Sequence, residues 1–165
     1  MLWFNRILAL ALLSLVTACA DLSVTPLASN DQAANAEVNI VAVAGRNGQL
    51  YTRTLRQRLH VNEAAIAEYD LISSLSSSSS STLSVRGASS TLKKMTMAVS
   101  FQLLNLKTGE IVLQDQVTSE ATLGAVTSYF GQDESERNAR ARLAQLLGNR
   151  VAQRIQLYFI SQSGE

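Results

Sequence analysis

An alternation of apolar and polar side chains between residues 95 and 103 constrains the fold most strongly. Every second residue there is large and apolar, and the residues between them are small or polar. The apolar residues are Met95, Met97, Val99, Phe101 and Leu103, separated by Thr96, Ala98, Ser100 and Gln102. Because successive side chains of a strand point to opposite faces, the segment is predicted to be a strand with one apolar face. The rest of the chain must supply a cover for that face.

Two further strands are predicted beside it. Residues 105–109 form a hairpin turn in which Gly109 supplies a positive φ, and residues 111–117 continue as the next strand. Upstream, residues 69–75 alternate and then enter six consecutive serines at 76–81, with a turn expected at 86–89. The serine run fits either a long exposed arm of a hairpin or a flexible loop. The three strands predict an antiparallel meander with one apolar and one solvent-exposed face.

Two amphipathic helices are predicted, one before and one after this meander in the sequence. In residues 49–60, Tyr51, Leu55 and Leu59 recur every four residues, and Asn47 is positioned to cap this helix. The final helix is expected to begin at a capping box of Asp133 and Glu136 and to run for about 25 residues. Its apolar stripe comprises Ala139, Leu143, Leu146 or Leu147, Val151 and Ile155, and Gly148 is its weak point.

The order of elements then determines the expected architecture. Residues 37–44 are rich in Val and Ile and predict a first strand covered on both faces. The order strand, helix, three strands, helix predicts an α/β (α+β) two-layer sandwich, a four-stranded mixed sheet with both helices on one face. The single domain is expected over residues 37–160, and residues 161–165 form a short tail.

The N-terminus carries an export signal. Arg6 precedes an apolar stretch of about ten residues, which suits a secretory signal and is too short to span a bilayer. Leu15 and Val16, the small residues Thr17 and Ala18, and then Cys19 follow, and this order resembles the bacterial lipobox. We therefore expect a lipoprotein signal peptide at 1–18, fatty acids such as palmitate on Cys19, and a tether at 19–36. The alternatives are a plain secretory signal and a membrane anchor.

Composition excludes several classes of function. The chain has 14 basic and 13 acidic residues, so it lacks the basic excess of a nucleic-acid-binding protein. One Cys and one His cannot form the usual zinc-binding clusters, and no cofactor is expected. No catalytic motif is present, and the single histidine, His60, is read as a helix-end residue. The sequence therefore predicts a protein that is not an enzyme.

Several segments together resemble the LPS-assembly lipoprotein family, LptE, and especially its alphaproteobacterial branch. They are the lipobox at Cys19, the strand VNIVAV, the helix GQLYTRTLRQRL, the YDL that opens a long hairpin, the strand ending FQLLNLKTGEIV, and a Thr-Ser-Tyr before the last helix. The resemblance implies a lipid-anchored protein of the outer membrane that plugs and helps assemble the LptD barrel and binds lipopolysaccharide. The alternative is an unrelated outer-membrane lipoprotein that activates a cell-wall enzyme.

Three cations near the expected turn at 86–89 are the candidate binding residues. Arg86, Lys93 and Lys94 could pair with the phosphates of lipid A, or they could form a solvated turn that protects an edge strand. The arginines of the last helix are expected on a solvated or barrel-facing side, and Tyr129 is expected to anchor the helix entry by packing. The residue after Cys19 is Ala20, which by the enteric sorting rule favours the outer membrane.

Overall fold

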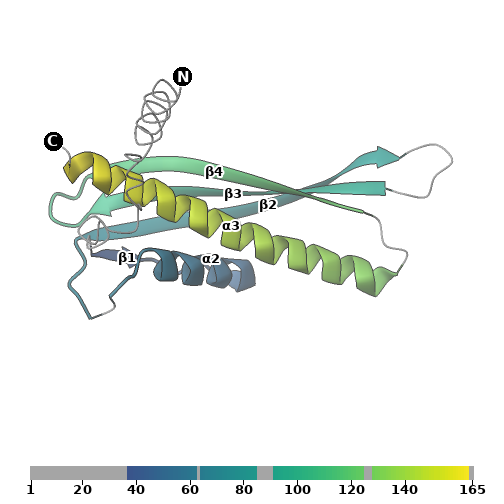
Figure 1. Ribbon diagram of the computed structural model, residues 1–165, viewed down its shortest axis with the longest axis horizontal. Helices are drawn as coiled ribbons and strands as arrows, with labels where there is room; N and C mark the ends of the chain where they lie inside the picture. The colour runs from purple at the N-terminus through teal and green to yellow at the C-terminus, as the bar shows by residue number, and fades with distance from the viewer. Residues whose placement is uncertain (1–36, 63, 85–90, 125–127, 164–165) are drawn as a thin grey trace, which may run out of the picture. The chain divides into compact units, whose positions relative to one another are not determined.

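The computed structural model describes residues 37–62, 64–84, 91–124 and 128–163, all within one compact unit, Gln32–Glu165. The elements follow the expected order. They are β1 (Val38–Ile40), α2 (Gly45–Arg58), β2 (Tyr69–Ser84), β3 (Thr91–Asn105), β4 (Ile111–Leu123) and α3 (Tyr129–Ser163) (Figure 1). The predicted signal peptide at 1–18, Cys19 and the tether at 19–36 lie outside the described residues. Within the described part of the chain, we find no helix with the length and hydropathy needed to cross a membrane.

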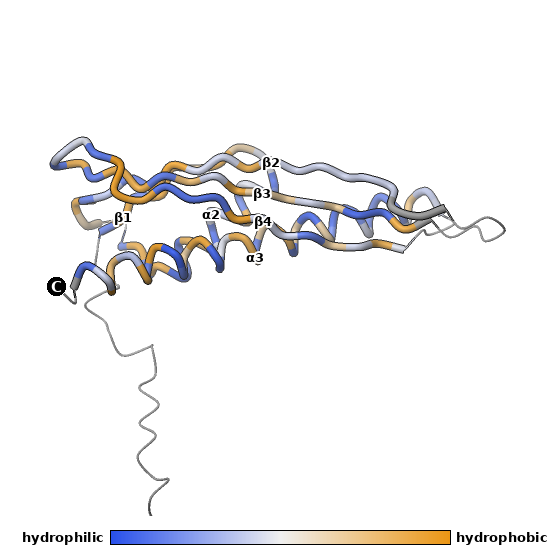
Figure 2. Tube along the Cα trace, turned by 90° about the horizontal axis from the view of Figure 1, so that it is seen from above, coloured by the Kyte–Doolittle hydropathy of each residue, from blue (hydrophilic) through white to orange (hydrophobic). Residues whose placement is uncertain are grey.

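The four strands form one mixed sheet in the order β1-β2-β3-β4. β1 runs parallel to β2, and α2 makes the crossover between them, whereas the β2–β3 and β3–β4 pairs are antiparallel. Seen from above, both helices lie on the same side of the sheet (Figure 2). The predicted α+β fold with two helices on one face is therefore confirmed.

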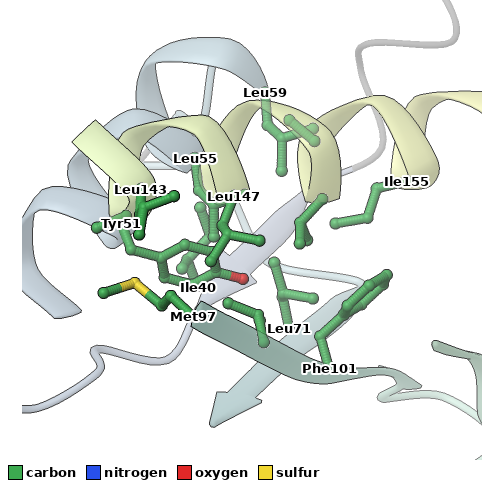
Figure 3. Packing of buried hydrophobic residues seen from close by; sticks show 14 of the residues in the cluster. Ile40, Tyr51, Leu55, Leu59, Leu71, Met97, Phe101, Leu143, Leu147 and Ile155 are labelled. Atoms are coloured by element: carbon green, nitrogen blue, oxygen red, sulfur yellow. The ribbon is translucent and has the colours of Figure 1, made fainter. Parts of the chain in front are cut away.

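The core lies between the helices and the alternating face of β3. Met95, Met97, Val99, Phe101 and Leu103 are all buried, as the alternation predicts. They meet the expected helix stripes (Figure 3), which contribute Tyr51, Leu55 and Leu59 from α2 and Ala139, Leu143, Leu147, Val151 and Ile155 from α3. Leu147 rather than Leu146 belongs to the α3 stripe, because Leu147 is fully buried and Leu146 is 42% exposed.

The serine run is part of a strand. β2 continues through residues 76–81 and pairs with β3 from Ser76 opposite Ala98 to Ser81 opposite Lys93. All six serines are exposed, so neither helix covers this part of β2. Backbone pairing to β3 therefore holds the run in place without side-chain burial. The expected turn at 86–89 lies outside the described residues.

α3 begins earlier than predicted. Ser128 precedes the helix, and its hydroxyl accepts a hydrogen bond from the Gly131 amide (3.4 Å), while its carbonyl accepts one from the Gln132 amide (3.0 Å). Asp133 and Glu136 thus lie inside the helix, and the predicted capping box is wrong. The helix has 35 residues, and it continues to Ser163, into the segment expected as a tail. At 1.5 Å per residue it is about 52 Å long.

The start of the domain also differs from expectation. β1 has three residues, and its central Asn39 is exposed, so the predicted strand over 37–44 is too long and is not covered on both faces. As an edge strand, β1 has a neighbour only in β2. α2 begins at Gly45, which places Asn47 inside the helix rather than at its cap.

Gly148 is a position where α3 approaches α2 closely. A Cβ atom added there would lie 2.9 Å from Thr54 Cβ and 3.1 Å from the Tyr51 carbonyl oxygen. Ala144 and Ala152 are buried one turn before and one turn after it on the same side of α3. The glycine, expected only as a weak point, is therefore required for close packing of α2 against α3.

Candidate functional site

The side of β2, β3 and β4 that faces away from the helices, called here the outer face, is polar and almost uncharged. On β3 its central residues are Lys94, Thr96, Ala98, Ser100 and Gln102, which alternate with the buried row, and Leu92 and Leu104 lie at its two ends. Serines of β2 and Gln, Thr and Glu residues of β4 lie opposite them. Soluble surfaces usually carry many charges of both signs. From Ile72 onward, only Lys94 and Glu120 are charged on this face among the described residues.

A shallow hollow of about 570 Å³ lies on the outer face. Six outer-face residues line it: Ile72, Ser74, Ser100, Gln102, Gln114 and Gln116. Hydroxyl and amide groups can donate and accept hydrogen bonds, and Ile72, 44% exposed, adds an apolar contact. The hollow can therefore bind an uncharged polar surface. Its outward-facing side chains include no group that could act as an acid, a base or a nucleophile activated by histidine.

Lys93 lies on the helix side of the sheet. Its Nζ donates to Glu136 Oε1 at 2.7 Å, which joins β3 to α3. Glu136 also accepts hydrogen bonds from Gln132 Nε2 and from the Arg140 guanidinium, each at 3.1 Å. The hydrogen bond from Lys93, followed by that from Gln132, lowers the pKa of Glu136. One of the predicted binding cations is thus part of a helix–sheet contact.

Lys94 lies on the opposite side of β3, on the outer face. Its Nζ is 2.7 Å from Glu120 Oε2 on β4, and both side chains are partly exposed. The hydrogen bond from Lys94 lowers the pKa of Glu120. The structure therefore does not bring the two lysines together, and each has a carboxylate partner. Arg86 lies outside the described residues, so binding of lipid A phosphate by the three cations stays a prediction.

The sequence contained a signal for this separation. Odd-numbered positions of β3 form the buried row, so Lys93 belongs with Met95 and Lys94 with Thr96. Their partners Glu136 and Glu120 were missed because they come from other elements. Sequence spacing alone does not give the strand register or the rotation of α3.

Two arginines of α3 contact β4. Arg150 donates to the Thr118 carbonyl oxygen and to Ser119 Oγ, both at 2.9 Å. Arg154 lies 3.5 Å from an oxygen of Asp115. Both residues are exposed, as predicted for a solvated side of α3, and each also contacts β4, which the sequence did not predict.

The start of α3 exposes two aromatic side chains. Tyr129 is 98% exposed and Phe130 is 80% exposed, so the prediction that Tyr129 packs at the helix entry is wrong. His60 follows the end of α2 with a φ of 48°, as expected of a helix-end residue. Among the described residues, no group of three or more His, Cys, Asp or Glu side chains could hold a metal ion.

Known proteins resemble this chain in structure. No protein-family model matches the sequence, and no curated protein matches it. A crystal structure from Caulobacter crescentus CB15, provisionally assigned as a lipoprotein, is 16% identical with a TM-score of 0.62, covering 78% of this chain and 96% of that chain. A minor lipoprotein from Acinetobacter baumannii is 12% identical with a TM-score of 0.57, covering 73% of this chain and 88% of that chain. The fold is therefore shared with both structures.

Proposed function

We propose that the chain is a lipid-anchored outer-membrane protein of lipopolysaccharide transport, which plugs the LptD barrel and binds lipopolysaccharide. The observation that carries the lipoprotein part is the agreement of two independent findings. The lipobox at Cys19 indicates an acylated N-terminus, and the fold matches structures assigned as lipoproteins in two Gram-negative bacteria. Three acyl chains of the kind that bacterial lipoproteins carry would make the tether effectively permanent, since one chain alone binds reversibly.

The outer face supports contact with a barrel interior. Barrel lumens are polar, and a long face of Ser, Thr and Gln offers hydrogen bonds without charges that must be desolvated. Interface centres are similarly depleted in charged residues. The hollow around Ile72 and Gln102 adds a site where side chains of a partner could insert. This face is the surface that we assign to the barrel.

The end of the sheet where β3 begins supports lipopolysaccharide binding. Lys94 is on the outer face, and a lipid A phosphate would have to displace Glu120 from it, since both bind the ammonium through charge-assisted hydrogen bonds. Removal of the competing carboxylate should therefore strengthen binding, while removal of the lysine should weaken it.

Co-purification from membranes tests the barrel partner. The tagged full-length chain should bring down a large outer-membrane barrel protein, and a variant with Gln102→Glu and Gln116→Glu in the hollow should bring down less. Lipidated, folded protein that retains no barrel would refute the proposal. Recovery of a peptidoglycan-modifying enzyme instead would favour the cell-wall alternative.

A variant of Cys19 tests the lipid anchor. Cys19→Ala should abolish acylation and release the chain from the membrane fraction, measured by mass spectrometry and fractionation. Cys19→Ser, which keeps the size of the side chain but removes the thiol, should behave in the same way. Unchanged membrane association of both variants would mean that the lipobox prediction is wrong.

Two opposite substitutions test the lysine. Lys94→Gln should weaken lipopolysaccharide binding about tenfold, because a charge-assisted hydrogen bond contributes about 1.5–3 kcal/mol. Glu120→Gln should strengthen binding, because it frees the same ammonium. Equal affinities for the parent and both variants would exclude Lys94 from the binding site.

A further inference from the structure

Within the described part of the chain, one edge of the sheet has no neighbouring strand over most of its length. β1 pairs with β2 only at Tyr69, Asp70 and Leu71, at one end of the longer strand (Figure 1). From Ile72 onward, β2 pairs with β3 alone among the described residues. In Figure 2 much of this stretch is pale, reflecting the moderate hydropathy of serine. This part of β2, from Ile72 to Ser84, is called here the open edge.

The orientation of backbone groups along the open edge follows from its paired end. The Tyr69 amide donates to the Glu37 carbonyl (3.2 Å), and the Leu71 carbonyl accepts from the Val41 amide (3.1 Å). Odd-numbered residues of β2 therefore point their backbone groups away from β3. In a regular strand this alternation continues, so the N–H and C=O groups of Ser73, Leu75, Ser77, Ser79 and Ser81 point away from β3, and the last three of these residues are exposed.

The open edge has few of the usual protections against strand addition. Natural edges carry charged side chains, proline, a bulge or a cover. Between Ile72 and Ser84 the sequence contains no charged residue and no proline, and the one irregularity in register comes at the far end, between Ser81 and Leu83. Ser77 and Ser79 are exposed even though they face the helix side, so α2 and α3 do not cover them.

We propose that the open edge pairs with the same edge of a second copy of this chain, antiparallel and around a two-fold axis near Ser78. An edge of alternating N–H and C=O groups is complementary to an extended backbone. In an antiparallel pair, the N–H groups of one copy donate to the C=O groups of the other, and the reverse. Pairing of identical edges closes both at once, as in an isologous interface. Because the centre is all serine, no like charges oppose each other in any nearby register.

The position of the axis determines which side chains meet. With the axis at Ser78, the outward-pointing residues Ser77 and Ser79 exchange hydrogen bonds across the interface. Ser78 then lies opposite its own copy in a non-hydrogen-bonded pair, where Cα atoms are about 4.5 Å apart. A pairing of this length buries little area, so the dimer should be weak in solution. Confinement of lipid-anchored copies to one membrane would raise their effective concentration.

Cysteine cross-linking of the full-length chain in membranes tests the pairing. Ser78→Cys should form a disulfide-linked dimer on mild oxidation, because the two side chains fall within the range of disulfide geometry. Thr118→Cys, on the outer face of β4, is the matched control and should not cross-link. The parent, whose single cysteine is Cys19, sets the background. Ser76→Cys and Ser80→Cys should cross-link less and locate the axis.

Introduction of a charge at the interface gives a second readout. Ser78→Lys places two ammonium groups opposite each other and should lower the dimer fraction at least tenfold, measured by chemical cross-linking in membranes, while Thr118→Lys should leave it unchanged. Absence of the Ser78→Cys dimer, or a dimer insensitive to Ser78→Lys, would overturn the proposal. Cross-linking of Ser78→Cys to a different protein without the homodimer would overturn it too. These readouts do not depend on the barrel or on lipopolysaccharide.

Discussion

The two edges of the sheet are built differently. On β4, the guanidinium of Arg150 donates a hydrogen bond to the Thr118 carbonyl oxygen, Arg154 lies beside Asp115, and Glu120 adds a charge. On β2, the serines at 76–81 are uncharged and exposed, and among the described residues they pair with β3 alone. The same sheet therefore has one edge guarded by α3 and one that is suited to strand addition.

The difference follows from where α3 crosses the sheet. α3 packs against β4 and α2, and its approach to α2 is set by Gly148. α2 in turn is tied to β1 and to the beginning of the open edge of β2, where Tyr51 is hydrogen-bonded to Ser73 at 3.0 Å. Burial raises the pKa of Tyr51 to about 12, so this hydroxyl stays neutral. Helix packing thus protects one edge and one end of the other.

The largest expected effect comes from proline on β2. Ser78→Pro removes an amide that is directed at β3 and should lower the free energy of unfolding by about 3 kcal/mol or more. Ser77→Pro removes an amide of the open edge and should cost much less, since proline is tolerated at edges. Urea denaturation of both variants measures the difference. Equal losses would mean that the assigned direction of the backbone groups is wrong.

A larger residue at Gly148 should separate the helices. Gly148→Leu forces a side chain into Thr54 and should cost about 1–3 kcal/mol, with loss of the Arg150 contact to β4 as α3 shifts. Gly124→Leu is the control, because a Cβ atom there meets nothing within 4 Å. Thermal unfolding measures the cost, and amide exchange of β4 reports the edge. A Gly148→Leu protein as stable as the parent would contradict the close approach.

Removal of the arginine that guards β4 tests that edge directly. Arg150→Met leaves the Thr118 carbonyl and the buried Ser119 hydroxyl without this donor, and it should cost about 1–2 kcal/mol. Arg142→Met, on an exposed position of the same helix, should stay within about 0.5 kcal/mol of the parent. Similar unfolding curves for the two variants would show that the contact does not stabilise β4.

The smallest effect is a dependence on pH. The Glu136 pKa lies below its ordinary value of 4.5, so the carboxylate contributes stability above pH 4.5 and loses it as the pH falls through the folded-state value. Glu136→Gln should cost no more than about 1 kcal/mol at neutral pH, and the gap to the parent should close in acid. The gap should shrink in a Lys93→Met background. A gap that is independent of pH would exclude this ion pair.

The sequence predicted the parts of the fold that repeat regularly. The alternation at Met95–Leu103 and the stripe from Ala139 to Ile155 predicted a strand, a helix and their buried faces. They could do so because every apolar residue of each pattern is buried against the same core. The positive φ of Gly109 was equally readable from its turn. Element ends were less predictable, since Ser128 caps α3 in place of Asp133 through backbone geometry that the residue pattern does not contain.

The candidate site was only partly predictable. The alternation along β3 already places Lys93 and Lys94 on opposite faces of the sheet. Their carboxylate partners depend on the strand register and on the rotation of α3. The need for Gly148 could not be predicted, because from sequence alone a glycine in a helix only indicates lower helix propensity. The close contact with α2 that requires it appears only in the structure. An open edge is a property of sheet order, and no local pattern in the serine run states which strand lies beside it.

The position of α3 after the four strands in the sequence also determines what the sheet lacks without it. Leu143, Leu147 and Ile155 cover the sheet that earlier residues form, so a polypeptide still lacking them has an apolar face with half its cover missing. Contacts between α2 and α3 join residues about 90 positions apart, as in the Arg58–Asn149 hydrogen bond. The core is therefore completed only once α3 has packed onto the sheet and onto α2.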